Sequence, residues 1–230
     1  QRCSNIFLYG MAIGACTADQ AEPLKVLMQP PKKKHFAALD VQEMPAFLNA
    51  VDEYNCQLQT RLVMKLMMLT FVRTSELNGA SWGEIDFKNN MWVISAERMK
   101  EKRAHFIPLS KQSLECLAQI RSINGNYPLL FPKRGTTNEP MSNSTILRVI
   151  ERVGYKGRMT GHGFRTLAST VLNESGEFDF DVIERQLSHQ DRDDVRAAYN
   201  RAKYMGERKR MMQWWSDYFD GLIFEGNKMR

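Results

Sequence analysis

Cysteine is scarce in this chain, whose 230 residues contain Cys3, Cys16, Cys56 and Cys116 and no others. The four are widely separated and match neither a CxxC pair nor the cysteine and histidine spacings of structural zinc sites. A zinc site of those kinds is therefore excluded. The sparse, unpaired usage indicates a reducing cytosol.

Long apolar runs are also missing. The most apolar stretch, residues 5–16, resembles the core of a signal peptide but is too short to cross a bilayer as a helix, so we expect no membrane partner. Because the chain begins with Gln1 rather than methionine, we expect it to be a fragment, with residues 5–16 forming the last helix of an upstream domain. We find no internal repeat and no low-complexity tract.

Acidic residues are outnumbered, 26 against 32 lysines and arginines, which gives a net charge of +6 and a pI near 9.2. This balance favours a polyanionic partner without identifying it. The cluster Asp191, Asp193 and Asp194 resembles metal ligands, but we interpret these residues as exposed acids at the start of a helix. We predict neither a metal nor a cofactor. A hydrophobic content of 43% is enough for one substantial core.

The stretch from His162 to Tyr199 holds the densest set of groups able to contact a phosphate. His162 and Arg165 are three residues apart, so they share one face of a helix, which apolar residues continue beyond them. The pair would stand at the helix N-terminus, where free N–H groups and the helix dipole favour an anion. The spacing therefore predicts a phosphate site.

Tyr199 is a candidate nucleophile within this stretch. A phenol has a pKa of about 10, so it needs cationic neighbours and a positioned phosphorus atom to react at neutral pH. Arg165, His162 and His189 are candidate neighbours. A second arginine, Arg73, would complete a guanidinium clamp on the two non-bridging oxygens.

Five sequence elements stand in a fixed order along the chain: Arg73-Thr-Ser-Glu-Leu77, Arg98-Met-Lys100 ahead of His105-Phe-Ile-Pro-Leu-Ser110, His162-Gly-Phe-Arg165, Leu187-Ser-His189 and Tyr199. Together they resemble the signature of the tyrosine recombinases, or phage-type integrases, and most closely prophage integrases of enteric-type bacteria. The resemblance covers roughly residues 36–220. A lone HxxR is a weak signal, whereas the five elements together are specific.

The resemblance implies an α+β, mainly helical, DNA breaking-rejoining catalytic domain with a small antiparallel hairpin or sheet. On this basis residues 1–29 are a remnant of an upstream core-binding domain, 30–38 a basic linker and 39–230 the catalytic domain. Paired prolines favour an extended linker. We interpret Lys32, Lys33 and Lys34 as a tether along the DNA backbone, with a solvated charge run as the alternative.

Hydrophobic periodicity and capping residues predict the elements of that domain. Asp40 and Glu43 resemble a capping box that opens a helix. Ser110 is predicted to cap another helix, which stops near Gly125. The remaining predictions are an apolar helix over 58–69, a hairpin formed by 91–95 and 105–109, and helices over 142–153, from 162 to about 173, and 181–187.

The resemblance also implies roles for the motif residues. Lys100, at the hairpin tip, would be the general acid for the leaving 5′ oxygen, with Lys102 as the fallback. Arg73, Arg165, His162 and His189 would stabilise charge on the phosphoryl oxygens. For Glu76, orienting a cation and lying on a helix surface stay open as alternatives. Tyr204 is a rival nucleophile, but Tyr199, ten residues after His189, fits the family spacing better.

The implied reaction is transesterification through a 3′-phosphotyrosyl link, without ATP, that integrates or excises a prophage or genomic island. Three alternatives remain from the sequence: DNA relaxation like that of a type IB topoisomerase, a metal-dependent nuclease, which would need clustered carboxylates, and a catalytically silent DNA-binding regulator. Gly163 within the HxxR motif and Ser188 before the histidine, where glycine is common, depart modestly from the family pattern.

The expected partners are double-stranded attachment sites and three further copies of the chain, with an excisionase and a DNA-bending host factor as additional candidates. The expected place is the bacterial cytoplasm, on the nucleoid. The aromatic segment 211–219 is predicted to dock on a neighbouring protomer, with packing on its own domain as the alternative. Further candidate DNA contacts are Lys102, Arg103, Lys133, Arg134, Lys156 and Arg158.

Overall fold

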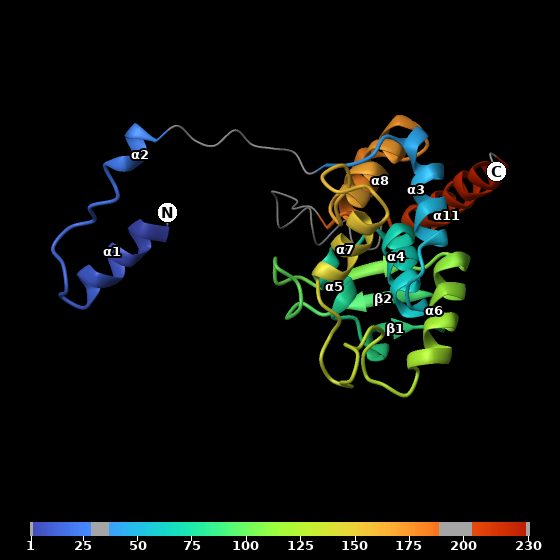
Figure 1. Ribbon diagram of the computed structural model, residues 1–230, viewed down its shortest axis with the longest axis horizontal. Coiled ribbons are helices and arrows are strands. Elements are labelled where there is room, and N and C mark those ends of the chain that lie inside the picture. Colours follow the sequence, from blue (N-terminus) through green and yellow to red (C-terminus); the bar gives the residue numbers. More distant parts are fainter. Residues whose placement is uncertain (1, 29–36, 189–203, 229–230) are drawn as a thin grey trace. The chain divides into compact units, whose positions relative to one another are not determined.

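The computed structural model describes residues 2–28, 37–188 and 204–228 (Figure 1). The chain divides into two compact units, residues 1–35 and residues 36–230. Of the predicted features, Lys32, Lys33, Lys34, His189, Tyr199 and the Asp191 to Asp194 cluster lie outside the described residues.

The smaller unit contains α1 (Arg2–Ala12) and the short α2 (Leu24–Leu27). The sequence predicts a helix over residues 5–16, whereas α1 begins and ends three to four residues earlier. Gly14 has a φ of +73° and the N–H of Ala15 bonds to the carbonyl of Gly10, so the chain turns out of the helix there. Because α2 follows, α1 is also not the last helix of this unit.

Helices α3 (Met44–Glu53), α4 (Leu58–Thr70) and α6 (Lys111–Asn124) form the body of the larger unit. The predicted apolar helix is α4, whose residues from Leu62 to Thr70, Lys65 excepted, are buried. The predicted caps are present: the N–H of Asp40 donates to the Glu43 carboxylate over 3.2 Å, and the Ser110 hydroxyl accepts from the N–H of Ser113 over 3.1 Å.

The small sheet is antiparallel, with the strand order β1 (Ile85–Asp86), β2 (Met91–Ile94), β3 (His105–Pro108). The predicted hairpin is confirmed, with Trp92 opposite Ile107 and Ile94 opposite His105. Strand β1 escaped prediction because two residues carry no periodic signal. The 3-10 turn η2 (Trp82–Glu84) precedes β1, and Glu84 accepts from the Trp92 indole over 3.0 Å.

Four shorter helices and a 3-10 turn also belong to the described part of the larger unit. They are α5 (Thr74–Asn78), α7 (Ser144–Arg152), α8 (Gly163–Glu174) and α9 (Phe180–Gln186), with the 3-10 turn η1 (Val41–Glu43) ahead of α3. Helices α7, α8 and α9 match the predicted ranges to within about two residues. Helix α5 was not predicted.

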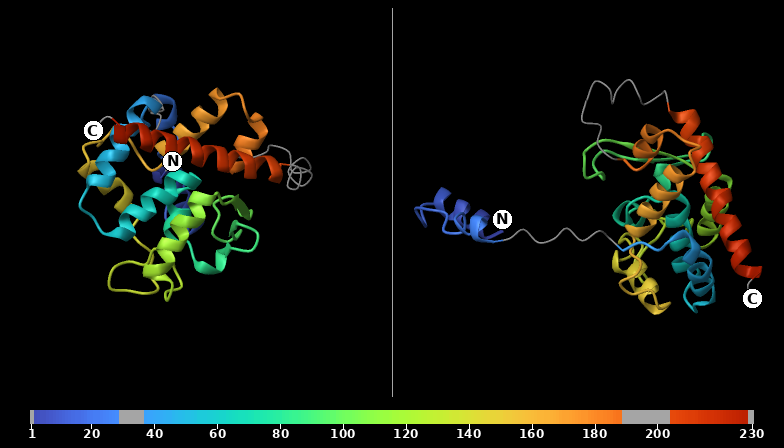
Figure 2. Two further views of the ribbon diagram at one scale, coloured as in Figure 1. Left: turned by 90° about the vertical axis from the view of Figure 1, so that its right-hand side faces the viewer. Right: turned by 90° about the horizontal axis from the view of Figure 1, so that it is seen from above.

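Helix α11 (Met205–Lys228) crosses one side of the larger unit as a single long helix (Figure 2). It packs against α3, α4, α6, α9 and β3. The Trp215 indole donates to the carbonyl of Met68 over 2.8 Å, and its ring meets Phe71 edge-on. Met211, Met212 and Phe219 are also buried, so the aromatic face predicted to dock on a neighbour belongs to this chain's own core.

No helix among the described residues is both long enough and apolar enough to cross a membrane.

Candidate active site

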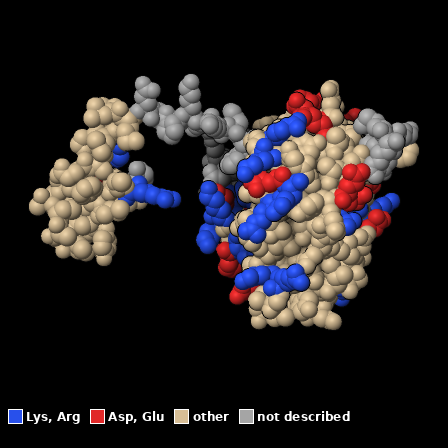
Figure 3. Space-filling model, viewed as in Figure 1, with Lys and Arg blue, Asp and Glu red and all other residues tan. Residues whose placement is uncertain are grey.

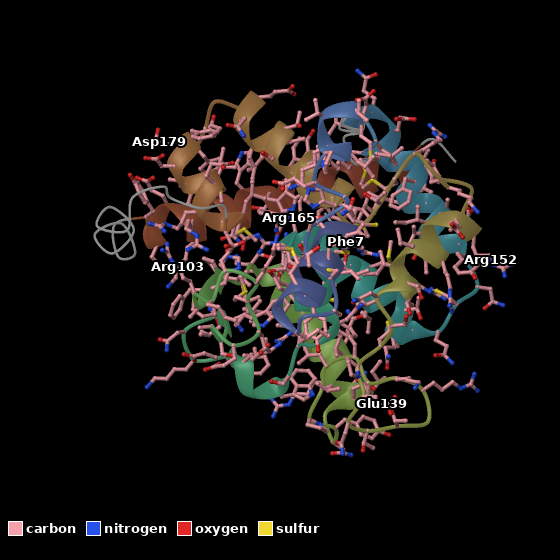
Figure 4. All side chains as sticks on the ribbon, turned by 90° about the vertical axis from the view of Figure 1, so that its left-hand side faces the viewer. Phe7, Arg103, Glu139, Arg152, Arg165 and Asp179 are labelled. Carbon is pink, nitrogen blue, oxygen red and sulfur yellow. The ribbon has the colours of Figure 1, made fainter. Side chains whose placement is uncertain are left out.

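A cleft of about 440 Å³ opens between α5, α7 and the start of α8. It brings together three of the predicted site residues, Arg73, His162 and Arg165. Figure 4 shows Arg165 near the middle of the larger unit, with Arg103 and Arg152 farther out. The remaining lining residues were not predicted from sequence: Thr74, Ser75, Asn143, Ile146, Leu147, Thr160 and Gly161.

Arg165 is buried, with 3% of its surface exposed. Its guanidinium donates from Nη1 to the carbonyl of Phe71 over 2.8 Å and from Nη2 to that of Leu187 over 2.5 Å. Phe71 ends α4 and Leu187 ends α9. Helix C-terminal carbonyls lack intrahelical partners and carry partial negative charge, so they stabilise the cation. Burial lowers the pKa of Arg165 to about 10, which leaves it charged at neutral pH.

Arg73 stands at the N-terminus of α5, and its Nη1 forms an ion pair of 2.7 Å with Oε1 of Glu76. Glu76 is 3% exposed, and its Oε2 accepts from the backbone N–H of Arg73 over 3.0 Å. One carboxylate thus caps the helix and fixes the guanidinium. Nη2 of Arg73 donates to the carbonyl of Ser188 over 3.3 Å. The two residues that follow α9 therefore contact both arginines, Leu187 contacting Arg165 and Ser188 contacting Arg73.

His162 is exposed at the N-terminus of α8 and is flanked by two glycines. A Cβ on Gly161 would lie 2.5 Å from Oγ1 of Thr74, and one on Gly163 would lie 2.5 Å from the carbonyl oxygen of Ala37. Neighbouring segments therefore approach on both sides of the histidine. The close approach of the Ala37 carbonyl explains the glycine at position 163.

Lys100 is exposed in the turn between β2 and β3, and that turn is anchored at its base. Arg98 pairs with Glu84 and donates from Nη2 to the carbonyl of Glu76 over 2.6 Å. Met99, next to Lys100, is 2% exposed. This contact could not be predicted, because Arg98 lies within a charged turn that predicts a solvated surface.

His105, the first residue of β3, is a buried histidine for which the sequence predicts no role. Burial, together with the nearby charges of Arg208, Arg165 and Arg73, lowers its pKa to about 3. It is therefore neutral at physiological pH. Of these three guanidinium groups, that of Arg73 pairs with the buried carboxylate of Glu76.

Ser188 and Tyr204 border residues 189–203, which the structure does not describe. Ser188 has a φ of +51°, in the left-handed region that glycine adopts more easily. Tyr204, the rival nucleophile, is partly buried and packs against the hydrophobic core.

The candidate DNA-contacting cations of the described part are all exposed. Lys133 pairs with Glu139, Lys156 with Glu151, and Arg158 with Glu43. Exposed ion pairs contribute about 0–1 kcal/mol, so a phosphate group can displace these acids. Figure 3 shows basic side chains at the edge of the larger unit that carries the turn between β2 and β3, where Lys100, Lys102 and Arg103 lie.

Fold and site together define a class of protein. The larger unit is a mainly helical α+β domain with a small antiparallel sheet, and its cleft presents two guanidinium groups and a histidine at a helix N-terminus. Such a set suits an oxyanion. Residues 2–28, 37–188 and 204–228 contain no group of three or more His, Cys, Asp or Glu side chains placed to hold a metal ion.

Comparison with known proteins identifies the family. The sequence model described as the phage integrase family matches residues 37–205, and the chain belongs to this family. It is 39% identical to the integrase of Enterobacteria phage P4 over 96% of this chain and 54% of that protein. It is 36% identical to prophage integrase IntA of Escherichia coli (strain K12), over 94% of this chain and 52% of that protein.

The fold has solved counterparts. A lambda integrase tetramer bound to a Holliday junction superposes with a TM-score of 0.59 at 19% identity, over 83% of this chain and 57% of that one. The larger unit thus has the fold of a tyrosine recombinase catalytic domain. The chain spans about half the length of the curated relatives it matches.

Proposed function

We propose that this chain carries out site-specific DNA recombination, integrating or excising a prophage or genomic island by metal-free transesterification. The observation that carries the proposal is the convergence of Arg73, Arg165 and His162 on one cleft, with α9 ending at both arginines. Helix α9 leads directly to His189, and Tyr199 follows ten residues later. Family membership gives the arrangement its chemical context.

In the proposed reaction, the Tyr199 oxygen forms a bond to the scissile phosphorus and the bond from phosphorus to the 5′ oxygen breaks. Arg73, Arg165, His162 and His189 stabilise the negative charge on the non-bridging oxygens. Lys100 gives its proton to the leaving 5′ oxygen, and His162 accepts the phenol proton. Each proton transfer contributes about 10²- to 10⁴-fold in rate.

A phosphotyrosyl ester retains the energy of the bond that was broken. A 5′ hydroxyl from a second duplex can therefore attack it and release Tyr199 without ATP. Glu76 has a supporting role in this scheme, since its carboxylate fixes the Arg73 guanidinium.

We further propose that double-stranded attachment sites are the substrate, that four protomers act together in the bacterial cytoplasm, and that an excisionase and a DNA-bending host factor assist. The solved lambda integrase tetramer on a Holliday junction supports this assembly by analogy. Because the aromatic face of α11 is buried within the chain, we place the contact between protomers on other surfaces.

Trapping the covalent complex tests the proposal. The full-length protein is incubated with a nicked duplex that carries its recombination site and loses the short leaving strand after cleavage. The expected result is a protein-linked DNA that forms in the presence of EDTA, forms with Tyr204→Phe, and is absent with Tyr199→Phe. DNA binding without any adduct would instead support a regulator.

A further inference from the structure

Arg208, on the first turns of α11, is a buried cation held by neutral groups. It is 5% exposed, and its Nε and Nη2 donate to the side-chain oxygen of Gln186 over 3.0 and 2.7 Å. Nη2 also donates to the carbonyl of Phe106. Among the residues that the structure describes, Arg208 has no carboxylate partner.

Burying a cation without a counterion opposes folding, because the charge loses its hydration. An apolar side chain of similar volume would fill the same space at lower cost. Arg208 nevertheless lies where α11 packs against α9 and β3, and it bonds to a residue of each. A planar guanidinium differs from an apolar group in fixing the relative geometry of the groups it bonds.

The groups that Arg208 joins have a particular place in the chain. Gln186, 1% exposed, is the last residue of α9 and comes three residues before His189. Arg208 comes nine residues after Tyr199. The contact between Gln186 and Arg208 therefore joins the two flanks of the segment 189–203, and this segment carries His189 and Tyr199.

The same contacts reach the other parts of the site. The two carbonyls after Gln186, those of Leu187 and Ser188, accept from Arg165 and Arg73. Phe106 lies in β3, which the turn carrying Lys100 leads into. Arg208 thus bonds to the helix end that meets the phosphate-facing arginines and to the strand that follows the predicted general acid.

We propose that Gln186 and Arg208 form a clasp that fixes both flanks of the nucleophile segment, which makes Arg208 a positioning residue for the attack by Tyr199. This inference rests on the proposed function. It assigns Arg208 no contact with the DNA or with the reacting atoms.

The test separates positioning of the nucleophile from support of the phosphate site. Arg208→Met and Gln186→Met remove the clasp with little change in volume, and Arg208→Lys keeps the charge without the planar fork. Arg210→Met is the matched control, because Arg210 lies two residues along α11 but contacts the Glu177 carbonyl and the Phe178 ring at the surface. Thermal unfolding identifies the variants that remain folded.

The first measurement is the single-turnover rate of adduct formation on the nicked duplex, alongside the affinity for DNA. We expect Arg208→Met and Gln186→Met to form the adduct about ten- to a hundredfold more slowly, because small displacements of a reacting group cost that much. Arg208→Lys should be intermediate and Arg210→Met unchanged. DNA affinity should stay within about twofold, since only the chemical step is affected.

The second measurement bypasses the tyrosine. In a Tyr199→Phe background, hydrogen peroxide supplies the nucleophile: the hydroperoxide anion bonds to phosphorus, the bond to the 5′ oxygen breaks, and that oxygen takes a proton. If Arg208 positions only the tyrosine segment, Arg208→Met leaves this cleavage unchanged. The clasp would be overturned if Arg208→Met slowed adduct formation and peroxide cleavage equally, or slowed neither. A wild-type protein that forms no adduct would instead contradict the proposed function.

Discussion

Arg165 and Arg208 are buried cations, and their hydrogen-bond partners among the described residues are neutral oxygens. The carbonyls at the ends of α4 and α9 hold Arg165, whereas His162 stays exposed at the mouth of the cleft. The arrangement suits an anion site, because the cleft combines a buried, hydrogen-bonded guanidinium with an exposed imidazole at a helix N-terminus.

Gly163 gives a test of the close packing beside His162. A Cβ there would lie 2.5 Å from the Ala37 carbonyl oxygen and 2.8 Å from the Met159 sulfur. We expect Gly163→Ala to lower the free energy of unfolding by about 1–3 kcal/mol, as overpacking does. Gly221→Ala, in open space on α11, should instead raise it by about 0.5–1 kcal/mol. Urea unfolding of both variants checks this, and equal effects would contradict the packing argument.

His105 predicts a pH dependence of stability. Its pKa falls from 6.5 to about 3 on folding, so between these values the unfolded chain binds a proton that the native chain does not. The contribution is complete above pH 6.5 and is lost as the pH falls toward 3. We expect His105→Gln to reduce the slope of stability against pH, between about pH 5 and 6, by up to about 1.4 kcal/mol per unit. Unchanged slopes in urea titrations would refute this assignment.

At the scale of elements, α11 matters more than the sequence indicated. Its pattern of apolar and aromatic residues fits packing in cis and in trans equally well, because both bury the same face. The structure places Trp215 against Phe71 and Met68, and the carbonyl of Phe71 accepts a hydrogen bond from Arg165. The helix is therefore part of the support of the site.

Two adjacent tryptophans test this role of α11. Trp215 is 1% exposed, whereas Trp214 is only partly buried and stacks on Tyr218. We expect Trp215→Ala to cost about 3–5 kcal/mol of stability and Trp214→Ala less than half of that. Thermal or urea unfolding of the two variants measures the difference. Equal losses would show that α11 is not packed in cis.

Much of the fold could be predicted because its elements carry local signals. Helix α4, the hairpin and the Ser110 cap follow from periodicity and capping residues. The contacts between elements could not be predicted in this way. The carbonyls that hold Arg165 and the clasp between Gln186 and Arg208 join residues far apart in the chain, and a backbone carbonyl leaves no trace in the sequence.

The same distinction between local signals and contacts applies to the site. Arg73, His162 and Arg165 were found from sequence because side-chain chemistry and spacing mark them, and the structure places them at one cleft. Arg98 and His105 were missed as contributors, since a turn arginine and a strand histidine have common structural explanations. The roles of all the candidate catalytic residues remain predictions: Arg73, Lys100, His162, Arg165, His189 and Tyr199.

At the scale of the whole molecule, the chain combines a net charge of +6 with exposed cations near the turn that carries Lys100. We expect duplex DNA binding that weakens steeply with salt, by about 0.9 in log–log slope for each phosphate neutralised. Replacing both Lys102 and Arg103 by Gln should reduce the slope. Fluorescence anisotropy at several salt concentrations measures it, and binding that ignores salt would contradict an electrostatic interface.

The most direct measurement identifies the residue that becomes joined to DNA. The trapped adduct of the full-length protein is digested with a protease and a nuclease, and the peptide that carries the residual nucleotide is sequenced by mass spectrometry. The account predicts a 3′-phosphate ester on Tyr199, formed equally in the presence of EDTA. A nucleotide on Tyr204 or any other residue would contradict the assignment, and cleaved DNA without any linked peptide would contradict the phosphotyrosyl mechanism itself.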